Sequence, residues 1–266
     1  MNDTVPRYAT YTYDHPNFLV NYPHRKRNKL VTEKIIAIGP ASWLDYGAGD
    51  GALLSTFISK QALPDLVVCY EPVANMHSQL EDNVSKLDIS AKSVKLAKTL
   101  ADLEDSFDLV SALEVLEHLP LPERIKFYCF LASKLKRDGQ VLIEIPVEYG
   151  PVLLLKECGR KFLKKRVSDY SPKELLNAAF FGKVADVQHR YLPQDNRTFI
   201  GAHRGFDLNR LFKELNSIGK IKGIMKSPFP FLPRIFNQTI LFSFELKEWD
   251  APKIQEAVIS VNRIEK

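Results

Sequence analysis

The feature that most constrains this chain is a glycine-rich turn within residues 42–51 (SWLDYGAGDG), between an apolar run and an apolar helical pattern. Gly47, Gly49 and Gly51 stand at alternate positions, two residues after Asp45. A chain that reverses between a strand and a helix needs backbone dihedrals that side chains forbid, and glycine supplies them. The missing side chains also let a ligand lie against the backbone, near the positive end of the following helix. The segment therefore predicts a strand, a ligand-binding turn and a helix.

Taken alone, this turn fits two kinds of site. With Ala52 as the third small residue, Gly47-x-Gly49-x-x-Ala52 matches the dinucleotide-binding fingerprint. Asp45 and Gly51 favour another interpretation, because the Asp45 carboxylate can accept hydrogen bonds from an amine or from loop amides, and Gly51 extends the pattern to GxGxG. In this form the turn resembles motif I of the class I S-adenosylmethionine-dependent methyltransferases.

Periodicity along the rest of the chain predicts alternating strands and helices. Residues 1–24 are rich in proline and aromatic side chains and are expected to be irregular, and residues 136–140 are expected to form a turn. Strands are expected over 42–46, 66–70, 93–97, 107–112, 141–146, 220–227 and 238–247. Helices are expected over 25–38, 51–62, 73–86, 121–135, 151–164, 172–181, 207–217 and 251–264.

Such alternation implies an α/β fold, a doubly wound and mostly parallel seven-stranded sheet with helices on both faces. The last two strands lack a long crossover and are expected to form an antiparallel edge hairpin. Long insertions are usually functional lids, so a mainly helical cap is expected after the fifth strand. The expected parts are an N-terminal aromatic segment and helix (1–40), a core (41–147 and 205–266) and a substrate-binding cap (148–204).

A second motif is more specific than the glycines. Residues 107–120 (FDLVSALEVLEHLP) resemble the motif IV region of the same methyltransferases. The resemblance implies S-adenosylmethionine as cofactor, with S-adenosylhomocysteine as product, and the broad small-molecule group of the family. It places Leu113 and Glu114 against the cofactor and turns His118 toward the acceptor. Capping a helix or packing behind the site is the alternative role for His118.

Two further strand ends are expected to contribute to the cofactor site. Glu71 lies 20 residues after Gly51 and precedes Pro72, and in a βαβ unit an acid so placed can accept hydrogen bonds from both ribose hydroxyls. In many relatives an acid after the third strand holds the adenine amine; here it is displaced to Asp102, so Thr99 and the Leu100 backbone are the first candidates. The predicted cofactor-binding residues are Asp45, Gly47, Ala48, Gly49, Gly51, Glu71, Pro72, Thr99, Leu100, Leu113 and Glu114.

Methyl transfer from a sulfonium depends mainly on holding the acceptor atom close and in line. A general base is needed only when the acceptor carries a proton. His118, His189 and His203 are the candidate bases, and none has a partner fixed by spacing. Because no cluster of acids with an amide can be assembled, no metal is expected.

The acceptor is predicted from charge and apolarity. The net charge of +5 is modest for a protein that tracks phosphates, so nucleic acid is not an expected partner. An anionic, partly apolar acceptor would suit the apolar turn at 228–236 and a basic cluster, whose alternatives are a membrane surface or a solvated helix face. That cluster comprises Lys156, Arg160, Lys161, Lys164, Lys165 and Arg166. We expect O-methylation of a sugar, glycan or lipid-linked intermediate.

Two other functions stay open. One is a catalytically silent methyltransferase-like module that binds a partner, and the other is an NAD(P)-dependent oxidoreductase. The three widely spaced cysteines and the lack of a signal pattern or of about 18–20 consecutive apolar residues predict a cytoplasmic protein. Peripheral contact with a membrane and the oligomeric state are left open.

Overall fold

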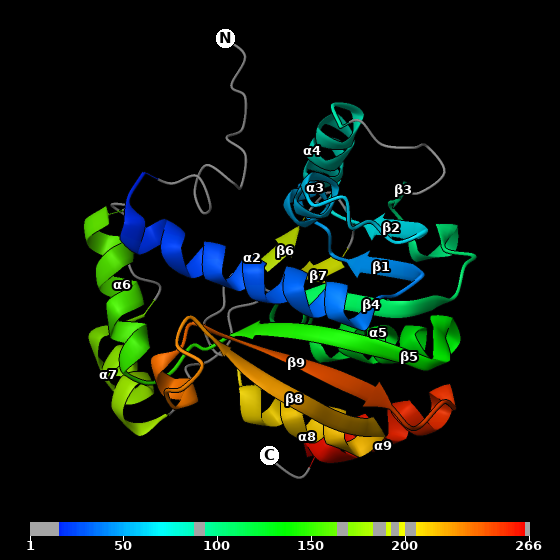
Figure 1. Ribbon diagram of the computed structural model, residues 1–266. Coiled ribbons are helices and arrows are strands. Elements are labelled where there is room, and N and C mark those ends of the chain that lie inside the picture. Colours follow the sequence, from blue (N-terminus) through cyan, green and yellow to red (C-terminus); the bar gives the residue numbers. More distant parts are fainter. Residues whose placement is uncertain are drawn as a thin grey trace. The chain divides into compact units, whose positions relative to one another are not determined.

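The computed structural model describes residues 16–87, 94–163, 170–182, 190–192, 197–199 and 206–263 (Figure 1). The main sheet contains β1 (Ser42–Tyr46), β2 (Leu66–Tyr70), β3 (Val94–Ala97), β4 (Phe107–Leu113), β5 (Leu135–Pro146), β8 (Gly219–Ser227) and β9 (Thr239–Leu246). Their order in the sheet is β3-β2-β1-β4-β5-β9-β8. A separate hairpin consists of β6 (Arg190–Leu192) and β7 (Arg197–Phe199). The predicted fold class, a doubly wound seven-stranded sheet with an antiparallel edge hairpin, is confirmed.

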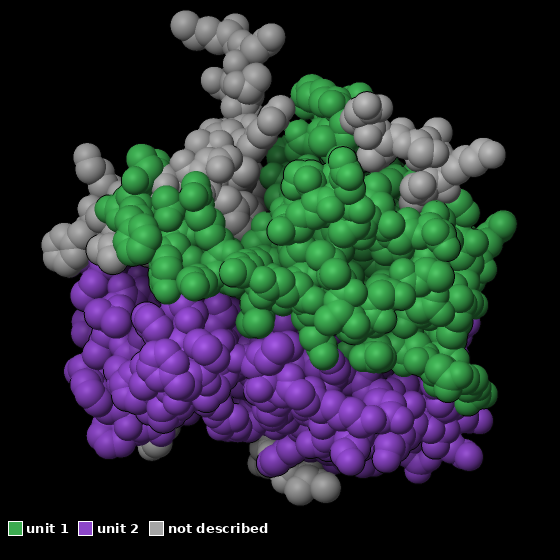
Figure 2. All heavy atoms as spheres, in the orientation of Figure 1, with its two compact units in different colours: residues 1–112, 134–141 green, residues 113–133, 142–266 purple. Residues whose placement is uncertain are grey.

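Helices lie between most of these strands. They are α2 (Phe18–Ile38), α3 (Ala52–Ser59), α4 (Ala74–Ser85), α5 (Leu121–Lys134), α6 (Pro151–Leu163), α7 (Pro172–Phe181), α8 (Leu208–Ile218) and α9 (Ala251–Arg263). Short 3-10 turns are η1 (Leu100–Asp102), η2 (Leu116–His118) and η3 (Arg234–Phe236). The chain divides into two compact units, which Figure 2 distinguishes by colour: unit 1 contains residues 1–112 and 134–141, and unit 2 contains residues 113–133 and 142–266.

Unit 1 contains the parallel strands β1, β2 and β3, with β1 paired to both β2 and β4. Asp45 is in register with Cys69 of β2 and with Ser111 of β4, and Cys69 is in register with Leu96 of β3. The carboxyl ends of these four strands are therefore level, and the segments that follow β1, β2 and β3 leave the same edge of the sheet.

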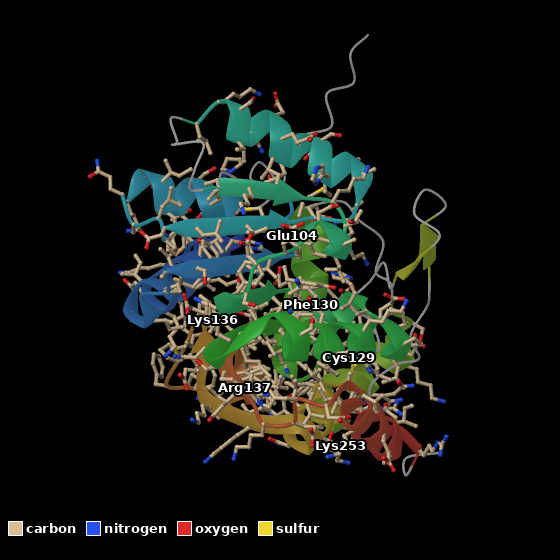
Figure 3. All side chains as sticks on the ribbon, turned by 90° about the vertical axis from the view of Figure 1, so that its right-hand side faces the viewer. Glu104, Cys129, Phe130, Lys136, Arg137 and Lys253 are labelled. Carbon is tan, nitrogen blue, oxygen red and sulfur yellow. The ribbon has the colours of Figure 1, made fainter. Side chains whose placement is uncertain are left out.

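The opposite end of unit 1 is fastened by Asp108 at the start of β4. Its Oδ2 accepts hydrogen bonds from the Ser42 amide at 2.8 Å and the Ser42 hydroxyl at 2.9 Å. Its Oδ1 lies 2.9 Å from Nζ of Lys136, which Figure 3 labels. Burial raises the pKa of Asp108, but the bonds from Lys136 and Ser42 outweigh it and the pKa is lowered. One carboxylate thus joins the first residues of β1, β4 and β5.

Unit 2 contains the antiparallel hairpin β8–β9, whose register shifts between Lys222 and Met225. Gly223, with φ +57°, lies at this irregularity. Helix α8 packs against β8 and α9, and α6 packs against α7 (Figure 1). The hairpin, the two helices after β5 and the C-terminal helix agree with the sequence-based predictions.

Two predicted boundaries are wrong. Residues 18–24 are helical rather than irregular, since α2 begins at Phe18 and contains Pro23. Pro23 removes one hydrogen bond of the helix, because it has no backbone N–H, but the helix continues beyond it. Residues 136–140 lie within β5, although a Cβ on Gly139 would lie 2.9 Å from the Lys136 carbonyl oxygen. This close approach means that the strand bends at Gly139, and the bend accounts for the turn-like composition of residues 136–140.

Buried charge in unit 2 connects three helices. Glu214 of α8 is fully buried, and its carboxylate accepts hydrogen bonds from Arg124 Nη2 at 2.8 Å and Nε at 2.9 Å. Tyr128, one turn after Arg124 on α5, donates at 3.1 Å, and the Asn262 amide of α9 donates at 3.0 Å. Burial and the Glu214 charge raise the pKa of Tyr128 well above its usual value. The carboxylate is therefore the common acceptor for side chains of α5 and α9.

Replacing Glu214 with glutamine should leave the buried Arg124 cation without its counter-charge. We expect Glu214→Gln to lower the free energy of unfolding by about 3–5 kcal/mol in urea titrations. Glu123→Gln on α5 is the control, because Glu123 pairs with the exposed Lys126 and such pairs contribute about 0–1 kcal/mol. Equal effects of the two substitutions would contradict the role given to Glu214.

Candidate functional site

The turn after β1 has the backbone that its glycines predict. Gly47, Gly49 and Gly51 have φ angles of +84°, +58° and +80°. The amides of Gly47 and Ala48 both donate to the Tyr70 carbonyl at the end of β2, at 2.8 and 3.0 Å. A Cβ on Gly51 would lie 2.7 Å from Cδ1 of the buried Leu80. A side chain there would meet both a strained backbone and α4.

Glu71 fastens this turn to β2. Its Oε2 accepts from the Gly49 amide and its Oε1 from the Val73 amide, both at 2.9 Å. Its own amide donates to the Ala97 carbonyl at the end of β3 at 3.0 Å. The predicted neighbourhood of Glu71 and the glycine turn is thus present, with Pro72 between Glu71 and Val73.

Asp45 is buried, and it is held by a side chain that sequence reasoning missed. The Ser111 hydroxyl donates to Asp45 Oδ1 at 2.7 Å, and the Trp43 indole donates to that hydroxyl at 2.8 Å. Burial raises the pKa of Asp45 to about 6, against the opposing effect of the Ser111 bond. The same burial, with the Asp45 charge, raises the pKa of the Cys69 thiol. A serine within the apolar run 107–113 was the available signal, but its partner lies 66 residues away.

The segment after β3 forms a self-contained turn. The Thr99 amide donates to Asp102 Oδ2 at 2.9 Å, and the Thr99 side chain caps η1 in return. This bond lowers the pKa of Asp102. The Asp102 carboxylate therefore accepts a hydrogen bond within its own turn. This agrees with the expectation that Thr99 and Leu100, rather than Asp102, are the first candidates for contacting adenine.

The motif IV residues from Leu113 onward lie at the start of unit 2. Leu113 ends β4, and Glu114 follows with φ +55°, a left-handed conformation that is unusual for a residue with a side chain. The Glu114 amide donates to the Glu144 carbonyl at 2.9 Å. His118 ends η2 and is partly exposed, with its Nε2 4.0 Å from Oε1 of the buried Glu117. Strained residues of this kind cluster at functional sites.

The basic cluster after β5 needs a correction at Lys156. Its Nζ lies 3.0 Å from Glu148 Oε1 and donates to the carbonyls of Val147 at 2.9 Å and Gln238 at 3.3 Å. Both side chains of this pair are largely buried, so Lys156 joins α6 to the end of β5 and the start of β9. Its prediction as a contact for an acceptor is wrong. Lys161 is exposed. The side chains of Arg160, Lys164, Lys165 and Arg166 lie outside the described part of the structure.

Two of the three candidate bases, His189 and His203, also fall outside the described residues. Within those residues, no group of three or more His, Cys, Asp or Glu could hold a metal ion. None of the helices that they form is long and apolar enough to cross a bilayer.

The raised pKa of Asp45 predicts a pH-dependent stability. The folded protein retains a proton on Asp45 where the unfolded chain, with a pKa of 3.8, has lost it, so this contribution is present at low pH and lost as the pH rises through about 6. Asp45→Asn removes the effect. Its unfolding free energy minus that of the parent should increase by about 2 kcal/mol between about pH 4.5 and pH 7.5.

Urea titrations at both pH values measure this difference. A difference that does not change with pH would refute the assignment of a buried carboxylate whose ionisation lowers the stability of the fold.

Comparison with known proteins agrees with this geometry. A family model described as a methyltransferase domain matches residues 21–216. The ubiquinone biosynthesis O-methyltransferase of Neisseria meningitidis is 30% identical over 145 residues, covering 50% of this chain and 58% of that protein. The enzyme of the same name from Pseudomonas entomophila is 28% identical over 125 residues, covering 46% and 51%. The chain thus spans between half and three fifths of these relatives' length.

Solved structures show the same fold at low sequence identity. An S-adenosylmethionine-dependent methyltransferase from Clostridium acetobutylicum has a TM-score of 0.57 and 15% identity, covering 88% of this chain and 96% of that one. Magnesium protoporphyrin IX methyltransferase from Synechocystis, with bound S-adenosylhomocysteine, has a TM-score of 0.54 and 16% identity, covering 86% and 87%. Because the family model matches most of this chain, the chain belongs to the methyltransferase-domain family, as its resemblance to the class I S-adenosylmethionine-dependent enzymes predicted.

Proposed function

We propose that this protein binds S-adenosylmethionine and transfers its methyl group to an oxygen of a small molecule. The observation that carries the proposal is the junction of Glu71 with the Gly49 amide at 2.9 Å. It holds an acid and a glycine-lined backbone at one sheet edge, where nucleosides bind in open α/β sheets. A structural neighbour was solved with the demethylated product bound. The two alternative functions are a silent binding module and an NAD(P)-dependent oxidoreductase. Each predicts a different result in the binding experiment below.

The chain's own residues suit each part of the cofactor. Glu71, at the end of β2 beside the glycine turn, accepts the ribose hydroxyls. The glycines of the turn let the amino-acid end lie against the backbone, while Thr99 and Leu100 contact adenine. When bound, the cofactor supplies a methyl group activated by its sulfonium. Burial disfavours the ionised form of Asp45, so a cation that approaches its carboxylate restores a favourable interaction.

Cofactor binding is tested by isothermal titration with S-adenosylhomocysteine and, separately, with NAD. We expect binding of the first ligand alone. Glu71→Gln should weaken it about ten- to hundredfold, since about 1–3 kcal/mol of charged hydrogen bonding is lost. Glu33→Gln changes an exposed glutamate of α2 and should leave affinity unchanged. Binding of NAD alone would support the oxidoreductase, and binding of neither would remove the enzyme assignment.

The acceptor is proposed from the relatives and from composition. The curated relatives are named as O-methyltransferases, which supports an oxygen acceptor on a small molecule. A sugar, glycan or lipid-linked intermediate is our more specific proposal, and it rests on the apolar turn at 228–236 and the basic residues after Lys156. His118, together with His189 and His203, is a proposed base for deprotonating a hydroxyl.

Methyl transfer from radiolabelled S-adenosylmethionine to three acceptor sets checks this proposal. The sets are phenolic quinone precursors, sugar nucleotides and lipid-linked sugars. We expect label on a hydroxyl oxygen of one of the sugar sets, with the rate falling by at least about tenfold in His118→Ala if that residue is the base. Label only on the phenols would replace the sugar proposal with a quinone one. No transfer to any set, with the cofactor bound, would favour the silent module.

A further inference from the structure

The backbone of Glu71 is held on both sides of its Cα atom. Glu71 is buried and follows the last residue of β2, and its amide donates to the Ala97 carbonyl at 3.0 Å. Its carbonyl oxygen lies 3.2 Å from Nδ1 of His77, a buried residue of α4. A carbonyl oxygen accepts hydrogen bonds and cannot donate them, so Nδ1 carries the hydrogen of this contact. His77 is therefore a donor to the peptide that follows Glu71.

The segment between β2 and α4 is short, and His77 contacts it twice. The Val73 amide donates to Glu71 Oε1 at 2.9 Å, and the Val73 carbonyl accepts from the His77 amide at 2.8 Å. Pro72, between them, has no backbone N–H and restricts Glu71 to an extended conformation. With the His77 ring on the Glu71 carbonyl, these bonds set the direction in which the Glu71 side chain leaves the backbone.

The helix that carries His77 is also joined to the glycine turn. Leu80 is fully buried, and its Cδ1 would lie 2.7 Å from a Cβ on Gly51. The side-chain amide of Asn83 donates to the Asp50 carbonyl at 2.7 Å. His77, Leu80 and Asn83 are spaced by three residues, so they share one face of α4. That face contacts both the glycine turn and Glu71, and it fixes the place from which His77 donates.

The other ring nitrogen of His77 has a less consequential contact. Nε2 lies 3.5 Å from Oε1 of Glu81, whose side chain is 60% exposed. An exposed pair one helical turn apart stabilises a helix only weakly. Removal of the donor to a buried carbonyl, by contrast, leaves that carbonyl unsatisfied at a larger cost. The Nδ1 contact with Glu71 is therefore the one whose loss should be felt.

We propose that His77 is a positioning residue for the cofactor. Its Nδ1–H holds the Glu71 carbonyl and so keeps the Glu71 carboxylate in place for the ribose hydroxyls. The inference rests on the proposed function, because His77 acts through the acid assigned to the ribose and needs no contact with the cofactor. A carboxylate that is fixed before the ligand arrives loses less conformational freedom on binding. The bond therefore contributes to affinity as well as to folding.

Two substitutions of His77 that differ in where they place a donor test the proposal by isothermal titration with S-adenosylhomocysteine. The amide nitrogen of asparagine is bonded to Cγ, as Nδ1 is, whereas that of glutamine lies one bond further out. We expect His77→Gln to weaken binding about five- to tenfold and His77→Asn to stay within about twofold of the parent. The control, Ser78→Gln, places the same side chain at an exposed neighbouring position of α4 and should leave affinity unchanged.

A double-mutant cycle shows whether the effect passes through Glu71. In the Glu71→Ala background, His77→Gln should cause no further loss of affinity, because the carboxylate that His77 positions is gone. Amide hydrogen exchange without ligand is a second readout. The amides of Gly49 and Val73 donate to that carboxylate. Their exchange should be at least about fivefold faster in His77→Gln than in the parent and unchanged in His77→Asn.

The proposal is overturned if His77→Gln binds as tightly as the parent, even where urea titration shows a lower free energy of unfolding, since His77 would then have a structural role alone. An equal loss in His77→Asn, or an undiminished loss in the Glu71→Ala background, also overturns it. If the parent itself did not bind S-adenosylhomocysteine, the proposed function would fall. Exchange of the Gly49 and Val73 amides would still decide whether His77 fixes Glu71.

Discussion

The carboxylate of Glu71 is the interaction on which the first unit's ligand edge depends. It joins the Gly49 amide of one loop to the Val73 amide of another, and the Glu71 backbone continues the connection to Ala97 at the end of β3. Three strand ends are thereby held together, with backbone amides as the donors. Because the glycine turn has little side-chain mass of its own, an external acceptor is the physical means of fixing its amides.

Buried charges have different roles in the two units. In unit 2, the Glu214 and Lys156 pairs have well-placed partners and connect helices to one another or to strand ends. In unit 1, Asp45 accepts a hydrogen bond from a neutral hydroxyl, and its burial raises its pKa. Removing one partner of a buried ion pair destabilises a fold, whereas a buried carboxylate beside a neutral group is one that a positively charged ligand can stabilise further. This contrast separates the structural acids of the chain from its candidate ligand-binding acid.

The periodicity of apolar residues was sufficient to predict most helices and strands, because each of them buries a single face or a continuous apolar run. β2 and α7 have the predicted bounds, and α6 ends one residue before its predicted end. The predictions failed at two segments where the local amino-acid composition disagrees with the backbone conformation. Pro23 was taken as a sign of irregular chain but lies inside α2, and Lys136–Gln140 has the composition of a turn but continues β5 through a bend. Both depend on packing against distant residues, which local composition does not encode.

By itself, the sequence determined the glycine turn, the acid that follows the second strand and the alternation that sets the fold, because these depend on local dihedrals and on a fixed strand–helix–strand spacing. Only the tertiary structure decided which polar groups are paired. Ser111 reaches Asp45 because β4 lies beside β1, and Lys156 leaves the basic cluster because β5 ends and β9 begins next to α6. Pairing across tens of residues follows from sheet order and helix docking, and neither can be deduced from the residues that take part.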